Sequence, residues 1–262
     1  MSRTRFADWS AVARVLGGLL LVYYAGPILA LVVAGATGGA LSRLRDPVVV
    51  RAATTSVAGA TTSTLIALVL GVPLAYWLAR TEWRFRTAAR ALAVLPLVVP
   101  PTVAGIVLLT VAGPGSPLGA ASAAAGLPLT RSFAGVVLAQ TFVASPFVVV
   151  TATAAFEGAD RRLEHASRSL GKGRWTTFRR VALPLAAPGV LAGATLAFAR
   201  ALGEFGATMV MAYYPRTLPI QIWVAFVSFG LERAYPIALL LVAIAAAVLA
   251  ALAALGSLPG WR

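Results

Sequence analysis

Residues Ser132–Phe156, SFAGVVLAQTFVASPFVVVTATAAF, form an unbroken uncharged run that ends at a polar, strongly basic stretch, residues 157–184. A helix needs about 20 mostly apolar residues to cross the hydrocarbon core of a bilayer. The run is long enough for one crossing, and the charges that follow mark where the chain leaves the membrane. We therefore expect an all-helical integral membrane protein.

Further apolar runs extend this pattern over the whole chain. They are Val15–Ser42, Ala52–Ala79, Ala91–Thr130, Ala234–Trp261, and a segment from Val181 to Tyr214 that only Arg200 and Glu204 interrupt. The sequence GPGSP at 113–117 divides the longest run, because clusters of Gly and Pro end helices. One membrane domain over residues 1–262 is predicted, with six spans near 12–33, 54–79, 90–112, 133–156, 185–213 and 234–256.

Two segments need separate comment in this count of spans. The first run, Val15–Ser42, is much longer than the apolar core of a cleaved signal peptide, which has about 7–15 residues, so a retained first span is expected. The apolar segment Thr217–Leu231 is short for a span. It is predicted to be an interfacial or re-entrant helix on the outer side.

The composition agrees with a membrane protein and excludes several other classes. Only 11% of the residues are charged and the mean hydropathy is +0.87, whereas soluble domains carry about 25% charged residues. The net charge of +14 has a membrane explanation, and no nucleic-acid motif accompanies it. With no cysteine and a single histidine, His165, neither a Cys-based nor a multi-histidine metal site is expected.

The distribution of basic residues predicts the orientation. Most Lys and Arg precede the first span or lie in residues 80–90 and 157–184. These segments are all cytoplasmic if the N-terminus is inside, as the positive-inside rule requires. A smaller cluster, Arg43, Arg45 and Arg51, falls on the outer side and weakens the bias. The prediction is N-in and C-in with an even number of spans.

The loop 157–184, EGADRRLEHASRSLGKGRWTTFRRVALP, is the longest polar interruption. Asp160 can cap a short helix, and Gly171 can end it in the left-handed conformation. Leu163, Ala166 and Leu170 would share one face of that helix. One interpretation is a basic amphipathic loop that lies on anionic headgroups.

The spacing in this loop resembles the EAA motif of ABC importer permeases, in which Glu-Ala-Ala, three residues and Gly precede nine residues and Ile-x-Leu-Pro. His165-Ala166-Ser167 and Gly171 occupy the first part, and Leu183-Pro184 the second. The resemblance implies that this helix docks on a partner ATPase. His165 replaces the usual Glu, with Glu164 just before it, so either could make the polar contact. The implied coupling residues are Leu163, Glu164, His165, Ala166, Ser167, Leu170, Gly171, Leu183 and Pro184.

Energy for transport is expected from a partner. The chain lacks the phosphate-binding sequence G-x-x-x-x-G-K-[ST], since Gly171-Lys172-Gly173 has neither the first glycine at the required offset nor the Ser/Thr. We therefore expect no catalytic residue and no cofactor on this chain. ATP and Mg would be bound by the partner ATPase.

Arg200 and Glu204 are four residues apart in the predicted fifth span. A charged residue at membrane depth costs at least about 2.5–3.5 kcal/mol on the insertion scale. On one helical face the two could partly neutralise each other. They are either a structural pair or part of the lining of a transport path. A high-affinity anion site formed by Arg200 alone is not expected, because the carboxylate of Glu204 beside it would repel the anion.

The segment Leu202–Thr208, LGEFGAT, and its continuation AYYP at 212–215 resemble the molybdate/tungstate permeases, as do residues 97–106, LVVPPTVAGI. Sulfate permeases share a looser version. The resemblance implies a type I ABC importer fold, a homodimer, two cytoplasmic ATP-binding subunits, an external oxyanion-binding protein and alternating access. The translocation path is then expected to include Arg200, Glu204, Phe205, Thr208, Pro100, Pro101 and Thr102.

Two other classes of membrane protein remain as alternatives. An ion-coupled secondary transporter should show inverted repeats, and none is visible. A membrane scaffold would leave the Arg200–Glu204 pair and the loop spacing without a purpose.

Overall fold

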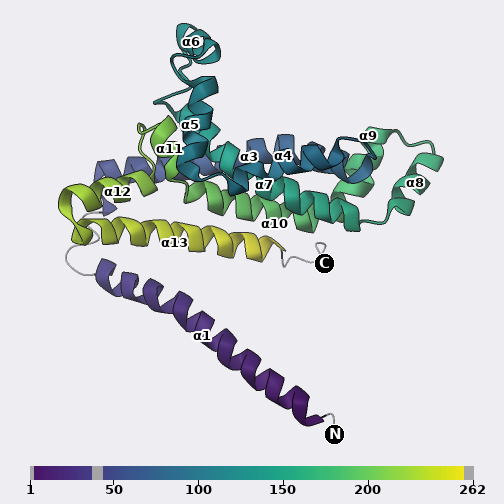
Figure 1. The fold of residues 1–262 in the computed structure, drawn as a ribbon, viewed down its shortest axis with the longest axis horizontal. Coiled ribbons are helices and arrows are strands. Elements are labelled where there is room, and N and C mark those ends of the chain that lie inside the picture. Colours follow the sequence, from purple (N-terminus) through teal and green to yellow (C-terminus); the bar gives the residue numbers. More distant parts are fainter. Residues whose placement is uncertain (1–2, 37–43, 257–262) are drawn as a thin grey trace.

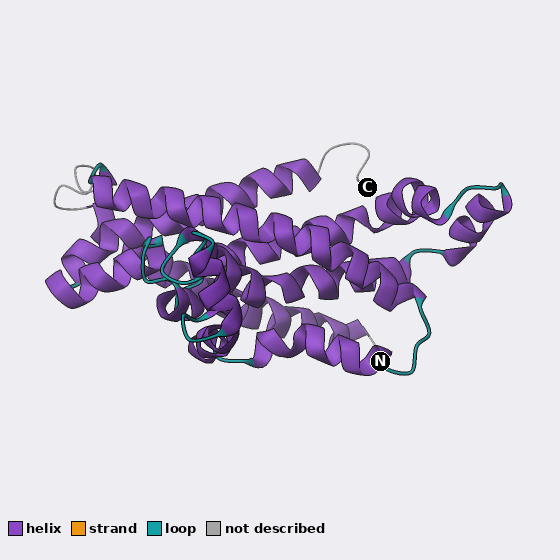
Figure 2. Ribbon diagram, turned by 90° about the horizontal axis from the view of Figure 1, so that it is seen from above, coloured by secondary structure: helices purple, strands orange, loops and turns teal. Residues whose placement is uncertain are grey.

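The computed structural model describes residues 3–36 and 44–256, and within these ranges it contains only helices and loops (Figures 1 and 2). Residues 37–43 and 257–262, which include Arg43 of the predicted outer cluster and the ends of two apolar runs, lie outside the described residues. The elements are α1 (Arg3–Ala36), α3 (Pro47–Arg80), α4 (Arg86–Val98), α5 (Pro101–Ala112), α6 (Pro117–Ala124), α7 (Phe133–Gly158), α8 (Arg161–Ser169), α9 (Arg174–Thr177), η1 (Phe178–Ala182), α10 (Leu183–Leu202), α11 (Gly206–Met211), α12 (Leu218–Phe229) and α13 (Leu231–Gly256).

The centre of the bundle is formed by α3, α7 and α10. Small residues dominate the contact, because lipid gives helices little reason to associate unless their backbones can approach closely. A Cβ added at Gly71 of α3 would lie 3.2 Å from Val148 of α7. Ala60, Ala144 and Ala197, one from each helix, are fully buried in the same cluster. Three helices are thereby locked side by side.

The remaining long helices pack less tightly. Leu241 and Ile244 of α13 are partly buried against the central cluster. Gly35, near the end of α1, approaches Leu239 of α13, and the rest of α1 diverges from the bundle (Figure 1). The N-terminal part of α1, the C-terminal part of α13, and α8 and α9 all lie at one end of the molecule, whereas α12 lies at the other (Figure 1).

In the described part of the chain, five helices are long and apolar enough to cross a membrane, and α4 with α5 forms a sixth candidate bent by 118°. The third span, expected as one helix near 90–112, is therefore broken. Proline disfavours a helical residue before it, and Val99 accordingly has ψ 125°, an extended conformation. Pro100 has ψ 137°, and Pro101 starts α5.

The fifth span also differs from the prediction. A helix over 185–213 was expected, but α10 ends at Leu202 and the separate short helix α11 begins at Gly206. Residues 203–205 between them are not helical. The short segment Thr217–Leu231 does contain one helix, α12, whose Leu218 N–H donates to Ser56 Oγ of α3 at 2.7 Å.

Candidate functional site

The loop 157–184 folds at its start as the sequence predicts. Asp160 caps α8, with its side chain accepting from Arg162 N–H at 2.9 Å. Gly171 ends the helix at φ 76°, a left-handed conformation that glycine adopts without strain. Gly171 N–H donates to Arg168 O and Lys172 N–H to Ser167 O, which satisfies carbonyls at the helix end.

The second half of the loop folds back on the first. The α9 and η1 segments lead into α10, and the Trp175 and Phe178 rings stack with centroids 5.6 Å apart. Ser167 of α8 shares a hydrogen bond of 3.0 Å with Thr177 of α9. Leu183 and Pro184 lie in the first turn of α10. The loop is thus a compact helical protrusion.

One face of this protrusion is open. Leu163, Leu170 and Trp175 are 49%, 79% and 70% exposed, and His165 and Ala166 are exposed with them. Clusters of exposed apolar side chains mark interaction surfaces. The loop has two of the features expected of a docking element, apolar exposure and a fold held together by its own contacts.

Glu164 has the opposite environment. It is only 3% exposed and accepts from Arg80 Nε at 2.7 Å and from the Tyr76 hydroxyl at 2.8 Å. The carboxylate is therefore engaged within the chain, and His165 is left as the exposed polar residue of the pair. Sequence reasoning missed Arg80 and Tyr76 because they are 84 and 88 residues away from Glu164.

The Arg200–Glu204 pair exists, but not along one continuous helix. Arg200 Nη1 lies 2.5 Å from Glu204 Oε2, across the point where α10 ends. The other oxygen of Glu204 accepts from Ala207 N–H at 2.7 Å. Glu204 is fully buried, and Arg200 is 29% exposed. Glu204 thus neutralises Arg200 and joins α10 to α11 across the break.

The breaks in the third and fifth spans lie against each other. A Cβ added at Gly206 would lie 2.9 Å from Pro101 Cβ and 3.0 Å from Thr102 N, and one added at Gly105 would lie 2.7 Å from Val210 Cβ. Only glycine permits so close an approach of α11 to α5. The two broken spans, which hold the predicted path residues, therefore touch at Pro101 and Thr102, and Thr208 of α11 is fully buried.

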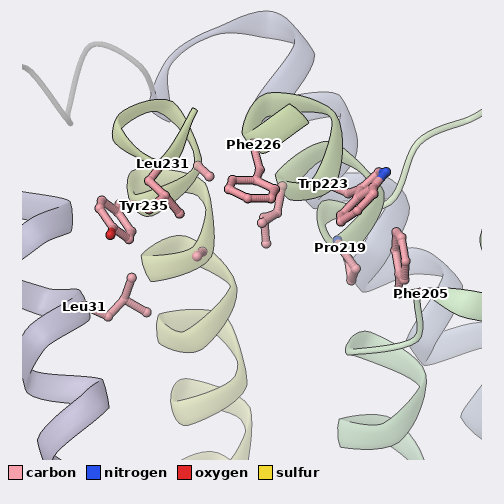
Figure 3. A pocket seen from close by; sticks show the side chains of 10 residues that line it. Leu31, Phe205, Pro219, Trp223, Phe226, Leu231 and Tyr235 are labelled. Carbon is pink, nitrogen blue, oxygen red and sulfur yellow. The ribbon is translucent and has the colours of Figure 1, made fainter. Parts of the chain in front are cut away.

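Phe205 points elsewhere. Its ring lies 5.8 Å from that of Trp223. It lines an open apolar pocket of about 390 Å³ together with residues of α12 and α13 and with Leu31 of α1 (Figure 3). Phe205 therefore contacts apolar surface, while Glu204 turns toward Arg200.

The comparisons with known proteins agree with this architecture. Residues 67–258 match the family described as binding-protein-dependent transport system inner membrane component. A probable molybdenum ABC transporter permease protein of Haloferax volcanii is 55% identical over 96% of this chain and 92% of its own length. The molybdate/tungstate transport system permease protein of Thermococcus kodakarensis is 36% identical over 87% of this chain and 88% of its own.

Solved structures support the fold. A bacterial alginate ABC transporter, crystallised in complex with alginate pentasaccharide-bound periplasmic protein, matches with a TM-score of 0.75 and 16% identity over 96% of this chain and 95% of its own. An inward-facing methionine ABC transporter matches with a TM-score of 0.62 and 20% identity, over 79% of this chain and 94% of its own. The predicted type I importer permease fold is confirmed. The chain belongs to the binding-protein-dependent transport system inner membrane component family, as a multi-pass ABC importer permease of the cytoplasmic membrane in its molybdate/tungstate group.

Proposed function

We propose that this chain translocates molybdate or tungstate into the cell by alternating access. It works as a homodimer with two cytoplasmic ATP-binding subunits and an external oxyanion-binding protein. The observation that carries the substrate assignment is the 55% identity, over nearly the whole chain, to a permease described as a probable molybdenum transporter. The breaks in the third and fifth spans, which lie against each other, support a transport path at that point.

The ATPase is proposed to dock on the α8–α9 protrusion. Leu163, Leu170 and Trp175 offer an apolar surface, with His165 beside them. Since the protrusion is held together internally, a partner can displace it without unfolding it. ATP and Mg would bind to that partner, and this chain would supply no catalytic group.

The translocation path is proposed to pass the junction of α5 with α10 and α11. Non-helical backbone at membrane depth is tolerated where it is buried in protein or lines a watery cavity. Residues 203–205 and 99–100 are such backbone, and the partly exposed guanidinium of Arg200 offers hydrogen-bond donors to a passing oxyanion. Its pairing with Glu204 weakens that attraction, which suits passage because a site that binds tightly would retain its ion.

The second copy is proposed to pack against α5. The 118° bend makes α5 project from the bundle (Figure 1). Val103, Ile106 and Val111 on α5 are 44–56% exposed. These exposed apolar side chains of α5, a helix that packs against α11 at Gly105, are well placed to contact a partner subunit as well as lipid.

The proposal is tested by reconstituting the permease with its ATPase and binding protein in proteoliposomes. Uptake of radiolabelled molybdate and tungstate should require ATP and the binding protein, and each should compete with the other better than sulfate does. Uptake driven by an ion gradient without ATP would overturn the mechanism. A preference for sulfate would overturn the substrate assignment.

A further inference from the structure

We infer that Glu164, Arg80 and Tyr76 form a rigid joint that transmits displacement of α8 to α3, so that Glu164 is a positioning residue for coupling rather than a contact of the ATPase. This inference rests on the proposed function, because it concerns how ATP-driven motion reaches the membrane helices. It assigns separate roles to Glu164 and to its exposed neighbour His165.

The joint is centred on one buried carboxylate. Glu164 Oε1 accepts from Arg80 Nε at 2.7 Å and lies 2.6 Å from Arg80 Nη2, while Oε2 accepts from the Tyr76 hydroxyl at 2.8 Å. The Arg80 and Glu164 side chains are 11% and 3% exposed. Tyr76 and Arg80 are four residues apart, so they lie on the same face of α3. Both oxygens of the carboxylate are thus bound to the last turns of one membrane helix.

Two backbone contacts reinforce the joint. Arg80 Nη2 donates to Ala159 O at 3.3 Å, just before α8, and Arg161 Nη2 donates to Ala79 O at 2.7 Å. The second contact places a cation at the C-terminal end of α3, where the helix dipole favours positive charge. The start of α8 is therefore tied to the end of α3 in both directions.

Tyr76 also connects the joint to the far end of the loop. Its ring packs edge-on against Phe156 of α7 and Phe178 of η1, with centroids 5.2 Å and 4.9 Å away. Trp175 stacks on Phe178 in turn. A displacement of the protrusion must therefore move α3 along with α7 and α10, which form the packed centre of the bundle.

Burial explains why the joint transmits force instead of yielding. Separating a buried ion pair leaves an uncompensated charge out of water, which is strongly unfavourable. The neighbouring pair of Arg86 with Glu157 has side chains 27% and 40% exposed, so water can replace that contact at little cost. Of these two ion pairs, that of Glu164 is the one that solvent cannot readily replace.

The test compares Glu164→Gln with Glu82→Gln in the reconstituted complex. Glu82 lies in the loop just after α3 and is exposed, so it controls for the same chemical change outside the joint. We expect Glu164→Gln to assemble with the ATPase and hydrolyse ATP, but to import at least about fivefold less oxyanion per ATP, the low end of usual coupling effects. Glu164→Asp, which keeps the charge, should recover part of the oxyanion imported per ATP. Glu82→Gln should import as much oxyanion per ATP as wild type.

A second measurement applies to the purified permease in detergent. The chain has no cysteine, so spin labels can be placed on Leu170→Cys and Val69→Cys, both exposed positions. The distance distribution should be narrow in the parent, and broad with Glu164→Gln or with the milder Tyr76→Phe.

The outcomes separate the two claims. An unchanged import ratio in an assembled Glu164→Gln complex, or an unchanged distance distribution in both joint variants, overturns the joint. If the wild-type complex imports no oxyanion with ATP, the proposed function fails, while the spin-label distances still decide whether the joint holds α8 to α3.

Discussion

Gly206 is the residue that lets the two broken spans touch, and Gly206→Ala tests this directly. The added Cβ would lie 2.9 Å from Pro101 Cβ and 3.0 Å from Thr102 N. These neighbours are a proline ring atom and a backbone atom at the start of α5, and neither can move aside by a side-chain rotation. Overpacking of this kind costs about 1–3 kcal/mol. Ala is favoured over Gly in the middle of a helix by about 0.5–1 kcal/mol, but Gly206 is the first residue of α11, so this gain is small and a net destabilisation of about 1–3 kcal/mol is expected.

Gly203→Ala is the matched control. Its Cβ would meet only Ala199 O, at 3.6 Å, an ordinary contact, and its φ of −86° suits any residue. Thermal unfolding of both variants in detergent can be followed by tryptophan fluorescence. At about 2–4 °C per kcal/mol, Gly206→Ala should lower the Tm by roughly 2–12 °C while Gly203→Ala leaves it unchanged. Equal Tm values for the two variants would refute the close contact between α5 and α11.

Three further substitutions probe the remaining features. Glu204→Gln should destabilise the chain because Arg200 loses its partner, but by less than the roughly 3–5 kcal/mol of a fully buried pair, since Arg200 is 29% exposed. Replacing both residues by Leu should cost less than Glu204→Gln alone when unfolding is measured for each. Gly171→Ala places an alanine in the left-handed backbone conformation, at a cost of roughly 1–2 kcal/mol, and should weaken association with the ATPase in a pull-down. Gly173→Ala, at a position with φ −65°, should bind the ATPase normally. Leu170→Glu, on a side chain already 79% exposed, should leave the Tm unchanged but abolish that association; retained binding would exclude this face as the docking surface.

Features set by nearby residues could be read from the sequence. Apolar length alone indicated the long helices, because a bilayer requires about 20 residues for each crossing. The short helix α8 followed from a capping aspartate and a terminal glycine, both of which act on backbone groups within a few residues. The 118° bend was missed even though Pro100 and Pro101 were seen, since a proline kink in a membrane helix has no fixed angle.

Contacts between distant segments required the tertiary structure. The sequence placed Glu164 and His165 side by side with equal claims, and only the burial of Glu164 against Arg80 and Tyr76 separated them. It predicted unbroken helices near 90–112 and 185–213, so neither the break in each span nor the meeting of the two breaks at Gly206 was expected. Hydrophobicity and capping are local, so the sequence alone determined the long apolar helices and the start and end of the short helix α8. Which carboxylate is buried and which breaks touch depends on how those helices pack, and only the fold decided that.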